Sequence, residues 1–167
     1  MITYILGVLC ALAIIVIDRI TKIYISSNFS LGDTAEFLKG FIDISYIHNR
    51  GAAWGMLSGQ TMLLLLIPIA VIIVCIIALI KYGKNSKLLF WAAMLVLSGG
   101  IGNLIDRAFN DGNVIDFLHF EFWPQFPVFN VADCAIVVGS GLLLLYFVID
   151  TVKDIKKQKQ EKENADI

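Results

Sequence analysis

The sequence predicts an all-α integral membrane protein, a bundle of four transmembrane helices with a small β-cradle outside the membrane. The chain has 167 residues, is 58% hydrophobic and has a mean hydropathy of +0.80. Its apolar residues gather in four segments, each close to the ~20 residues that a bilayer core requires. A soluble domain of this size would have to expose much of that apolar side chain. The alternating stretch Phe41–Ile47 is typical of a half-buried strand, and it predicts the small sheet.

The four expected spans form a single membrane domain, residues 1–167. Pro68 lies within the second span, where we expect a kink, because membrane helices tolerate proline when neighbours satisfy the freed carbonyl. The first span differs from a cleaved signal peptide, since Asp18-Arg19 follows where small residues should mark the cut. The expected spans are about 2–25, 61–80, 88–105 and 131–149, with outer loops 26–60 and 106–130, a cytoplasmic loop 81–87 and a cytoplasmic tail 150–167.

The distribution of lysines orients the bundle. Three lysines lie in the 81–87 loop, and five more follow Asp150. Loops rich in lysine and arginine stay in the cytoplasm, so both termini are expected there and the two long loops outside. Arg19 and Lys22 oppose this trend but are outnumbered. The polar tail is expected to be a frayed helix without a site of its own.

Composition also excludes several classes of protein. A net charge of −1 gives no electrostatic support for nucleic-acid binding. The cysteines and histidines are scattered, without the spacing of a metal site, so we expect no metal. The residues concerned are Cys10, Cys75, Cys134, His48 and His119.

Asp116 and Asp133 are the first candidates for chemistry. They lie 17 residues apart, in Val-Ile-Asp-Phe and Phe-Asn-Val-Ala-Asp, and both are expected near the outer interface. A carboxylate at the centre of a membrane helix costs ~2.5–3.5 kcal/mol, so those that remain near spans are functional candidates. Two carboxyls that share a proton can activate water, as in an aspartic protease. The structural alternatives are helix N-terminal charge compensation for Asp133 and an exposed loop acid for Asp116.

Further polar residues lie where the spans end. The third span carries Gly99, Asn103, Asp106 and Arg107 on one helical face, which should point into the bundle or a wet cavity. The alternative is a structural network of Asp106 with Arg107, with Asn103 as interhelical glue. Asp18 and Lys22 form an i,i+4 pair that is either functional or purely architectural.

The outer loop after the expected strand combines small residues with one aromatic. Residues 49–55 read Asn-Arg-Gly-Ala-Ala-Trp-Gly, as in a loop that closely approaches a ligand. Trp54 fits two interpretations, a membrane-interface anchor or a substrate contact.

Five short blocks, in order, join these residues into a pattern. They are Asp18-x-x-Thr-Lys22, Asn49-x-Gly-Ala-Ala53, Gly99-x-x-Gly-Asn-x-x-Asp-Arg107, Val114-Ile-Asp-Phe117 and Phe129-Asn-Val-Ala-Asp133. The chain thereby resembles lipoprotein signal peptidase, the bacterial type II signal peptidase, along nearly its whole length. Two positions depart from the family: Arg19 stands where Gln is usual, and Cys134 where Ser or Ala is usual.

The resemblance implies a cofactor-free aspartic endopeptidase in the bacterial cytoplasmic membrane, with its active site at the outer face. Its substrates would be prolipoproteins carrying a diacylglyceryl group, cut just before the lipidated lipobox Cys. Globomycin-type inhibitors and membrane lipid are the other implied partners. Matching positions give Asp116 and Asp133 as catalytic, Asn49, Gly51, Arg107 and Asn130 as substrate-binding, and Asp18, Lys22, Asn103 and Asp106 as supporting the site.

Two rival functions come from other classes. A small transporter or channel would use the two aspartates as a proton or cation relay, but they lie at one interface and no inverted repeat is evident. A non-catalytic lipoprotein-binding or assembly factor is the second rival. Cleavage of a lipidated substrate by the purified protein separates all three.

Overall fold

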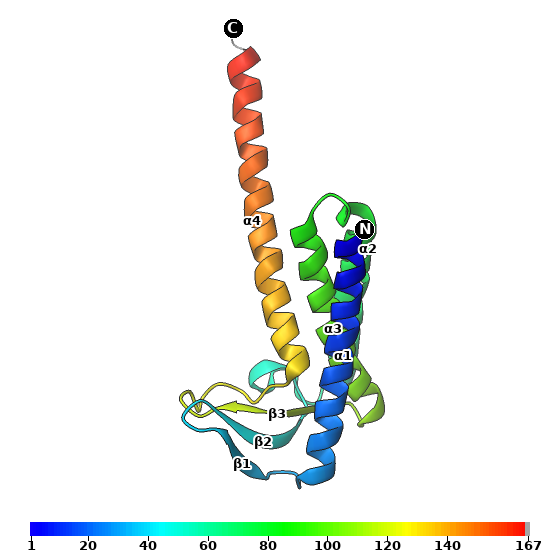
Figure 1. The fold of residues 1–167 in the computed structure, drawn as a ribbon, viewed down its shortest axis with the longest axis vertical. Coiled ribbons are helices and arrows are strands. Elements are labelled where there is room, and N and C mark those ends of the chain that lie inside the picture. The colour runs from blue at the N-terminus through cyan, green and yellow to red at the C-terminus, as the bar shows by residue number, and fades with distance from the viewer. Residues whose placement is uncertain (166–167) are drawn as a thin grey trace.

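Four long helices and a three-stranded sheet at one end of the bundle make up the fold (Figure 1). The structure is a computed structural model and describes residues 1–165. All four helices are long and apolar enough to cross a membrane, which confirms the expected fold class. In chain order the elements are α1 (Ile2–Asn28), β1 (Thr34–Leu38), β2 (Ile42–Asn49), the short 3-10 helix η1 (Ala53–Gly55), α2 (Thr61–Tyr82), α3 (Lys87–Phe109), β3 (Val114–Phe120) and α4 (Val131–Ala165).

The helices extend past the segments expected to span. The largest difference is in α4, which continues as one helix to Ala165 where a frayed tail was expected. Lysine, glutamine and glutamate are good helix formers, and Lys157 and Glu161 approach to 3.9 Å at i,i+4 spacing. Pro68 lies inside α2, which stays helical through it. Residues 166–167 of the expected tail lie outside the described residues.

α3 is the central helix, because it packs against each of the other three. Its glycines allow a close approach to the start of α4. A Cβ on Gly99 would lie 2.2 Å from the carbonyl oxygen of Ala132, and one on Gly102 would lie 3.2 Å from the Cβ of Ala132. Small residues of this kind let membrane helices pack backbone to backbone. The polar ends of α3 and α4 are therefore held within side-chain reach of each other.

The sheet is antiparallel in the order β1-β2-β3. β2 is the strand expected around residues 41–47, and Gly32, with φ of 93°, forms the expected turn before β1. β3 was not anticipated, since residues 106–130 were expected to be loop. In the register of β2 with β3, Ile47 lies opposite Asp116 and Asn49 lies opposite Val114. This pairing brings residues of the 26–60 segment beside residues of the 106–130 segment.

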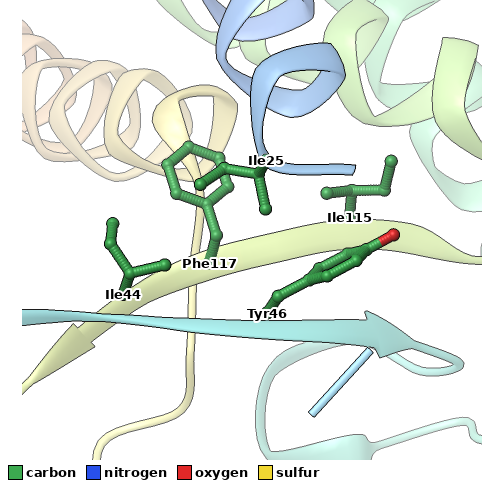
Figure 2. Close-up of a cluster of buried hydrophobic side chains, with 5 residues drawn as sticks. All are labelled: Ile25, Ile44, Tyr46, Ile115 and Phe117. Carbon is green, nitrogen blue, oxygen red and sulfur yellow. The ribbon is translucent and has the colours of Figure 1, made fainter. Parts of the chain in front are cut away.

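A small apolar core joins the sheet to the end of α1. Figure 2 shows the side chains of β2 and β3 rising toward Ile25 at the end of that helix. The cluster consists of Ile25, Ile44, Tyr46, Ile115 and Phe117, each at most 8% exposed. Since side chains alternate along a strand, Asp116 points away from the face of β3 that carries its two neighbours. The apolar core therefore holds β3 in place, and the side chain of Asp116 lies on the opposite face of the strand.

The segment leading into α4 is fastened to β3. The backbone nitrogens of Phe117 and Leu118 lie 3.0 and 2.8 Å from the carbonyl oxygen of Phe129 and donate to it. The nitrogen of Phe129 donates in return to the carbonyl of Leu118 at 2.9 Å. This bridge holds the chain against the strand just before α4 begins. The first turn of α4 is thereby placed next to Asp116.

Candidate active site

Asn130 joins the two candidate aspartates. Its side-chain Nδ2 donates to Asp116 Oδ1 at 2.6 Å, and its backbone nitrogen donates to Asp133 Oδ2 at 3.1 Å. Its Oδ1 accepts from the backbone nitrogen of Asp133 at 2.9 Å. Asp116 lies within β3 and is only 1% exposed, so the exposed-loop interpretation of this residue is wrong. The strand and the helix thus present their carboxyls to one shared residue, Asp116 to the side chain of Asn130 and Asp133 to its backbone.

The hydrogen bonds between Asn130 and Asp133 form a reciprocal cap at the start of α4. The side chain of each residue accepts from the backbone nitrogen of the other. This is the arrangement of a capping box, with aspartate in place of glutamate. Asp18 adds a third cap, because its Oδ1 accepts from the nitrogen of Ala132 at 2.9 Å. Asp133 therefore fulfils the capping role considered from sequence while one of its oxygens remains available to other partners.

The second oxygen of each carboxyl, the one that Asn130 does not contact, accepts from the side-chain amide of another asparagine. Asn49 Nδ2 donates to Asp116 Oδ2 at 2.8 Å, and Asn103 Nδ2 donates to Asp133 Oδ1 at 2.7 Å. Among the side chains that the structure describes, neither carboxyl forms an ion pair with a cation. The pair is therefore oriented by neutral donors, which fix its geometry and leave its charge uncompensated by direct contact.

Burial changes the protonation of Asp116. Desolvation, followed by the negative charge of Asp133, raises the pKa of its carboxyl from the ordinary value of 3.8 to about 7. The hydrogen bonds from Asn49 and Asn130 act in the opposite direction, because they stabilise the ionised form. A carboxyl with this pKa holds its proton through much of the range near neutrality. One proton in the pair is the condition for acid–base chemistry by two carboxyls.

A buried cluster of charges supports the pair from the bundle side. Lys22 is 0% exposed, and its Nζ lies 2.8 Å from Asp18 Oδ2 and 3.0 Å from Asp106 Oδ2. The same Nζ donates to Asn103 Oδ1 at 3.0 Å. Arg19 joins this cluster from its exposed edge, with its side chain 41% exposed and Nη1 3.2 Å from Asp106 Oδ1. Removing one partner of a buried ion pair typically lowers the free energy of unfolding by about 3–5 kcal/mol. We therefore expect these charges to hold the residues around the pair in place.

This cluster reaches both aspartates. Asp106 Oδ2 accepts from the backbone nitrogen of Ile115 at 3.1 Å, which anchors β3 immediately before Asp116. Asn103 receives Lys22 on its oxygen and donates from its nitrogen to Asp133. Asp106 is thus paired with Arg19 and Lys22 and not with Arg107, contrary to the structural network considered from sequence.

Arg107 turns instead toward the loop that follows β2. Its Nη2 donates to the carbonyl oxygen of Gly51 at 3.0 Å, while the nitrogen of Gly51 donates to Asn49 Oδ1 at 2.9 Å. A Cβ on Gly51 would lie 2.7 Å from the carbonyl oxygen of Met56, so only glycine fits. The Nε of Arg107 is buried and has no hydrogen-bond partner among the described residues. Arg107 therefore offers an unused donor beside the loop of Gly51.

Three other positions noted in the sequence fall around the site. Trp54 in η1 is 66% exposed and has a φ of 54°, and its ring lies 6.0 Å from that of Phe126 in an edge-on contact. Its two interpretations, anchor and substrate contact, both stay predictions. Of the two departures from the family pattern, Arg19 takes part in the charge cluster and Cys134 is exposed beside Asp133.

A four-helix membrane bundle that joins two buried carboxyls through Asn130, one from the sheet and one from a helix, defines a class of membrane-embedded enzyme. Comparison with known proteins identifies the family. The family model for signal peptidase (SPase) II matches residues 10–149. Lipoprotein signal peptidases of Clostridium acetobutylicum and Bacillus pumilus are 40% and 41% identical to this chain, each over 86% of this chain and 92% of the relative. A solved structure of a bacterial membrane enzyme matches with a TM-score of 0.80 at 33% identity, covering 87% of this chain and 88% of that one. The chain belongs to the signal peptidase II family of aspartic endopeptidases.

Proposed function

We propose that Asp116 and Asp133 are the catalytic pair with which this chain removes the signal peptide from diacylglyceryl-modified prolipoproteins, cutting just before the lipidated Cys. The observation that carries the proposal is the shared contact with Asn130, which donates to one carboxyl from its side chain and to the other from its backbone. The relatives named above are lipoprotein signal peptidases, which supports the same substrate class for this chain.

The reaction follows from the chemistry of two close carboxyls. The ionised partner takes a proton from a water molecule, whose oxygen attacks the carbonyl carbon of the scissile peptide bond. The protonated partner donates to the carbonyl oxygen as the carbon becomes tetrahedral. As the C–N bond breaks, the protonated carboxyl gives its proton to the leaving amine of the lipidated Cys. The other carboxyl takes a proton from a hydroxyl of the tetrahedral carbon, which becomes the new C-terminal carboxyl of the signal peptide, so the pair again holds one proton. Because the carboxyls titrate as a unit, no fixed role is assigned to either aspartate.

The loop of Asn49 and Gly51 and the side chain of Arg107 are the proposed contacts to the substrate backbone. The buried Nε of Arg107 is a donor without a partner among the described residues, and a substrate carbonyl would satisfy it. Asn49 already donates to Asp116, so a substrate held by this loop would lie beside the pair. Asn130 is 0% exposed, and its burial favours a positioning role over direct contact with substrate.

The proposed orientation puts the sheet and the pair at the outer face of the bacterial cytoplasmic membrane. In Figure 1 the N-terminus and the α2–α3 connection lie at the end of the bundle away from the sheet, and α4 runs in the same direction. The lysines of residues 81–87 and of the α4 extension favour the cytoplasm for that end. A lipid-anchored Cys would then remain in the outer leaflet while its peptide reaches the pair.

Globomycin-type inhibitors are proposed to occupy the same site. A peptide-like inhibitor would replace the substrate backbone at Arg107 and Asn49 and exclude the attacking water from the carboxyls. Cleavage in its presence should decrease, and raising the concentration of substrate should restore it if both compete for one site.

The test is cleavage by the purified, detergent-solubilised protein of two substrates that differ only in lipidation. The expected result is a mature product that begins at the diacylglyceryl-Cys, identified by mass spectrometry, with little cleavage of the unmodified precursor. A non-catalytic lipoprotein-binding factor would bind the lipidated precursor without cutting it, and a relay would do neither. Cleavage at another bond, or equal cleavage of both precursors, would contradict the proposed specificity.

A further inference from the structure

A second concave site lies at the end of the bundle opposite the sheet. Figure 1 shows α4 leaning away from α2 and α3 toward this end. A pocket of about 760 Å³ opens where they diverge, between the end of α2, the start of α3 and the middle of α4. This volume is in the range of small-molecule sites, ~300–1,000 Å³. The proposed peptidase chemistry uses none of the residues that line it.

The lining of this pocket changes from apolar to polar along the helices. Ala78, Leu89 and Phe147 provide apolar walls, whereas Tyr82, Ser86 and Lys153 provide polar groups. Tyr82 is the last residue of α2, and Lys153 lies beyond Phe147 toward the C-terminal end of α4. The polar groups therefore gather at the end of the pocket farther from the sheet, and the apolar walls continue into the membrane-spanning part of the helices. Such a gradient matches the boundary between lipid headgroups and acyl chains, where tyrosine is also enriched.

The surroundings of the pocket are basic. The 81–87 segment contributes three lysines and no acid, and residues 150–157 contribute three lysines against Asp150 and Asp154. Asp150 also lines the pocket, so its polar end is not uniformly positive, but lysines outnumber acids around it. Lysines close to the membrane surface attract anionic lipids by about 1 kcal/mol each. Charge complementarity thus favours an anionic occupant over a zwitterionic one.

We infer that this pocket binds one anionic phospholipid, with its phosphate at Lys153 and an acyl chain along Ala78, Leu89 and Phe147. Ser86 Oγ accepts from the nitrogen of Leu89 at 3.2 Å as the cap of α3, which leaves its hydroxyl hydrogen as a donor for a phosphate oxygen. Tyr82, which also lines the pocket, offers a second hydroxyl. The bound lipid fills the space that α4 leaves by diverging, and it ties α4 to α2 and α3 at the end remote from the sheet.

Native mass spectrometry of the delipidated full-length protein in detergent tests the charge requirement. Phosphatidylglycerol should bind more tightly than phosphatidylcholine with the same chains. Lys153→Gln should weaken the binding of phosphatidylglycerol by about fivefold, the change that corresponds to ~1 kcal/mol for one lysine. Lys162→Gln is the matched control, since it removes the same charge from α4 at a position outside the pocket. Its affinity should stay at the wild-type value.

A steric pair of variants tests the apolar part. Ala78→Trp places a bulky side chain where the acyl chain would lie and should abolish binding of the phospholipid in the pocket. Ala70→Trp adds the same side chain to an exposed position of α2 and should leave that binding unchanged. Prolipoprotein cleavage by each variant reports that the bundle is folded. Equal binding of the two lipids to the wild type would overturn the proposal. So would equal effects on lipid binding within either matched pair of variants, because the bound lipid would then be only the non-specific lipid around the helices.

Discussion

The Nδ2 of Asn130 donates to Asp116 Oδ1 at 2.6 Å, although the two residues belong to different elements of the site. Asn130 caps α4, and Asp116 lies in the middle of β3. One amide therefore couples the start of a membrane helix to the side chain of a strand. A shift of either element would break the cap or the contact with the carboxyl, so the geometry of the pair depends on Asn130.

Two substitutions of Asn130 should separate its role as the cap of α4 from its role in orienting Asp116. Asn130→Ala removes both, so the protein should lose about 0.5–2 kcal/mol of stability along with most of its activity. Asn130→Ser keeps an oxygen that can accept from the nitrogen of Asp133, but it removes the amide donor to Asp116. Its melting temperature should therefore exceed that of Asn130→Ala, while its cleavage rate stays low. An active Asn130→Ser variant would show that the amide donor is dispensable.

The plot of kcat/KM against pH should have a descending limb near neutrality. The pKa of Asp116 is raised to about 7, so the pair loses its remaining proton as pH rises through that value, and kcat/KM should fall above it. Asn49 donates to the ionised carboxyl and lowers its pKa, so Asn49→Ala should move the limb to higher pH. A limb that moves to lower pH, or does not move in this variant, would contradict the assignment.

The raised pKa of Asp116 should also make the folded protein less stable as pH rises toward neutrality. The folded protein binds a proton on Asp116 between pH 3.8 and about 7 that the unfolded chain releases. The stability from this group is therefore present below 3.8 and is lost as pH rises through about 7. Melting temperatures measured across this range should fall less steeply for Asp116→Asn than for the wild type.

Arg107 should affect substrate binding more than folding. Loss of its hydrogen bonds to the Gly51 loop and to substrate should cost about 1.5–3 kcal/mol in kcat/KM for Arg107→Ala. Arg107→Lys is the matched control, because it keeps the charge but lacks the planar fork, and it should recover only part of the loss. If sub-saturating kinetics were unchanged in Arg107→Ala, the residue would have no part in binding.

The orientation in the membrane can be tested with two introduced thiols, in a background lacking Cys10, Cys75 and Cys134. Asn85→Cys, in the exposed α2–α3 connection, should react with an impermeant reagent only in permeabilised cells. Lys39→Cys, in the exposed β1–β2 turn, should react in intact cells. The reverse pattern would put the aspartates on the cytoplasmic side and contradict the proposed orientation.

Much of the bundle could be predicted because the length of an apolar segment can be read directly from the sequence. The four spans are readable in this way, and so is β2, whose side chains alternate. β3 was missed because Val114–Phe120 is apolar at nearly every position and lacks a period of two. Its identity as a strand depends on pairing with β2, which is a long-range property of the fold.

The residues of the candidate site were all singled out from the sequence, but their contacts were not. Spacing along the third span does not indicate that Asp106 pairs with Arg19 and Lys22 while Arg107 turns to Gly51, since those partners come from other elements. One signal was available and not used. Asn130 and Asp133 stand three residues apart at the start of an apolar run, which is the spacing of a capping box.

Cleavage of a diacylglyceryl-modified prolipoprotein by purified Asp116→Asn and Asp133→Asn variants tests the central claim most directly. Asparagine is nearly isosteric with aspartate, so both variants should insert and melt as folded proteins. Each should lose at least ~10²–10⁴-fold in rate, because each lacks a group that takes or gives a proton. The double variant should be little worse than either, since the pair acts as a unit. Asp106→Asn is the control, and it should mainly lower the melting temperature, because Asp106 holds Lys22 and Arg19. Near-wild-type cleavage by either Asp116→Asn or Asp133→Asn would contradict the account.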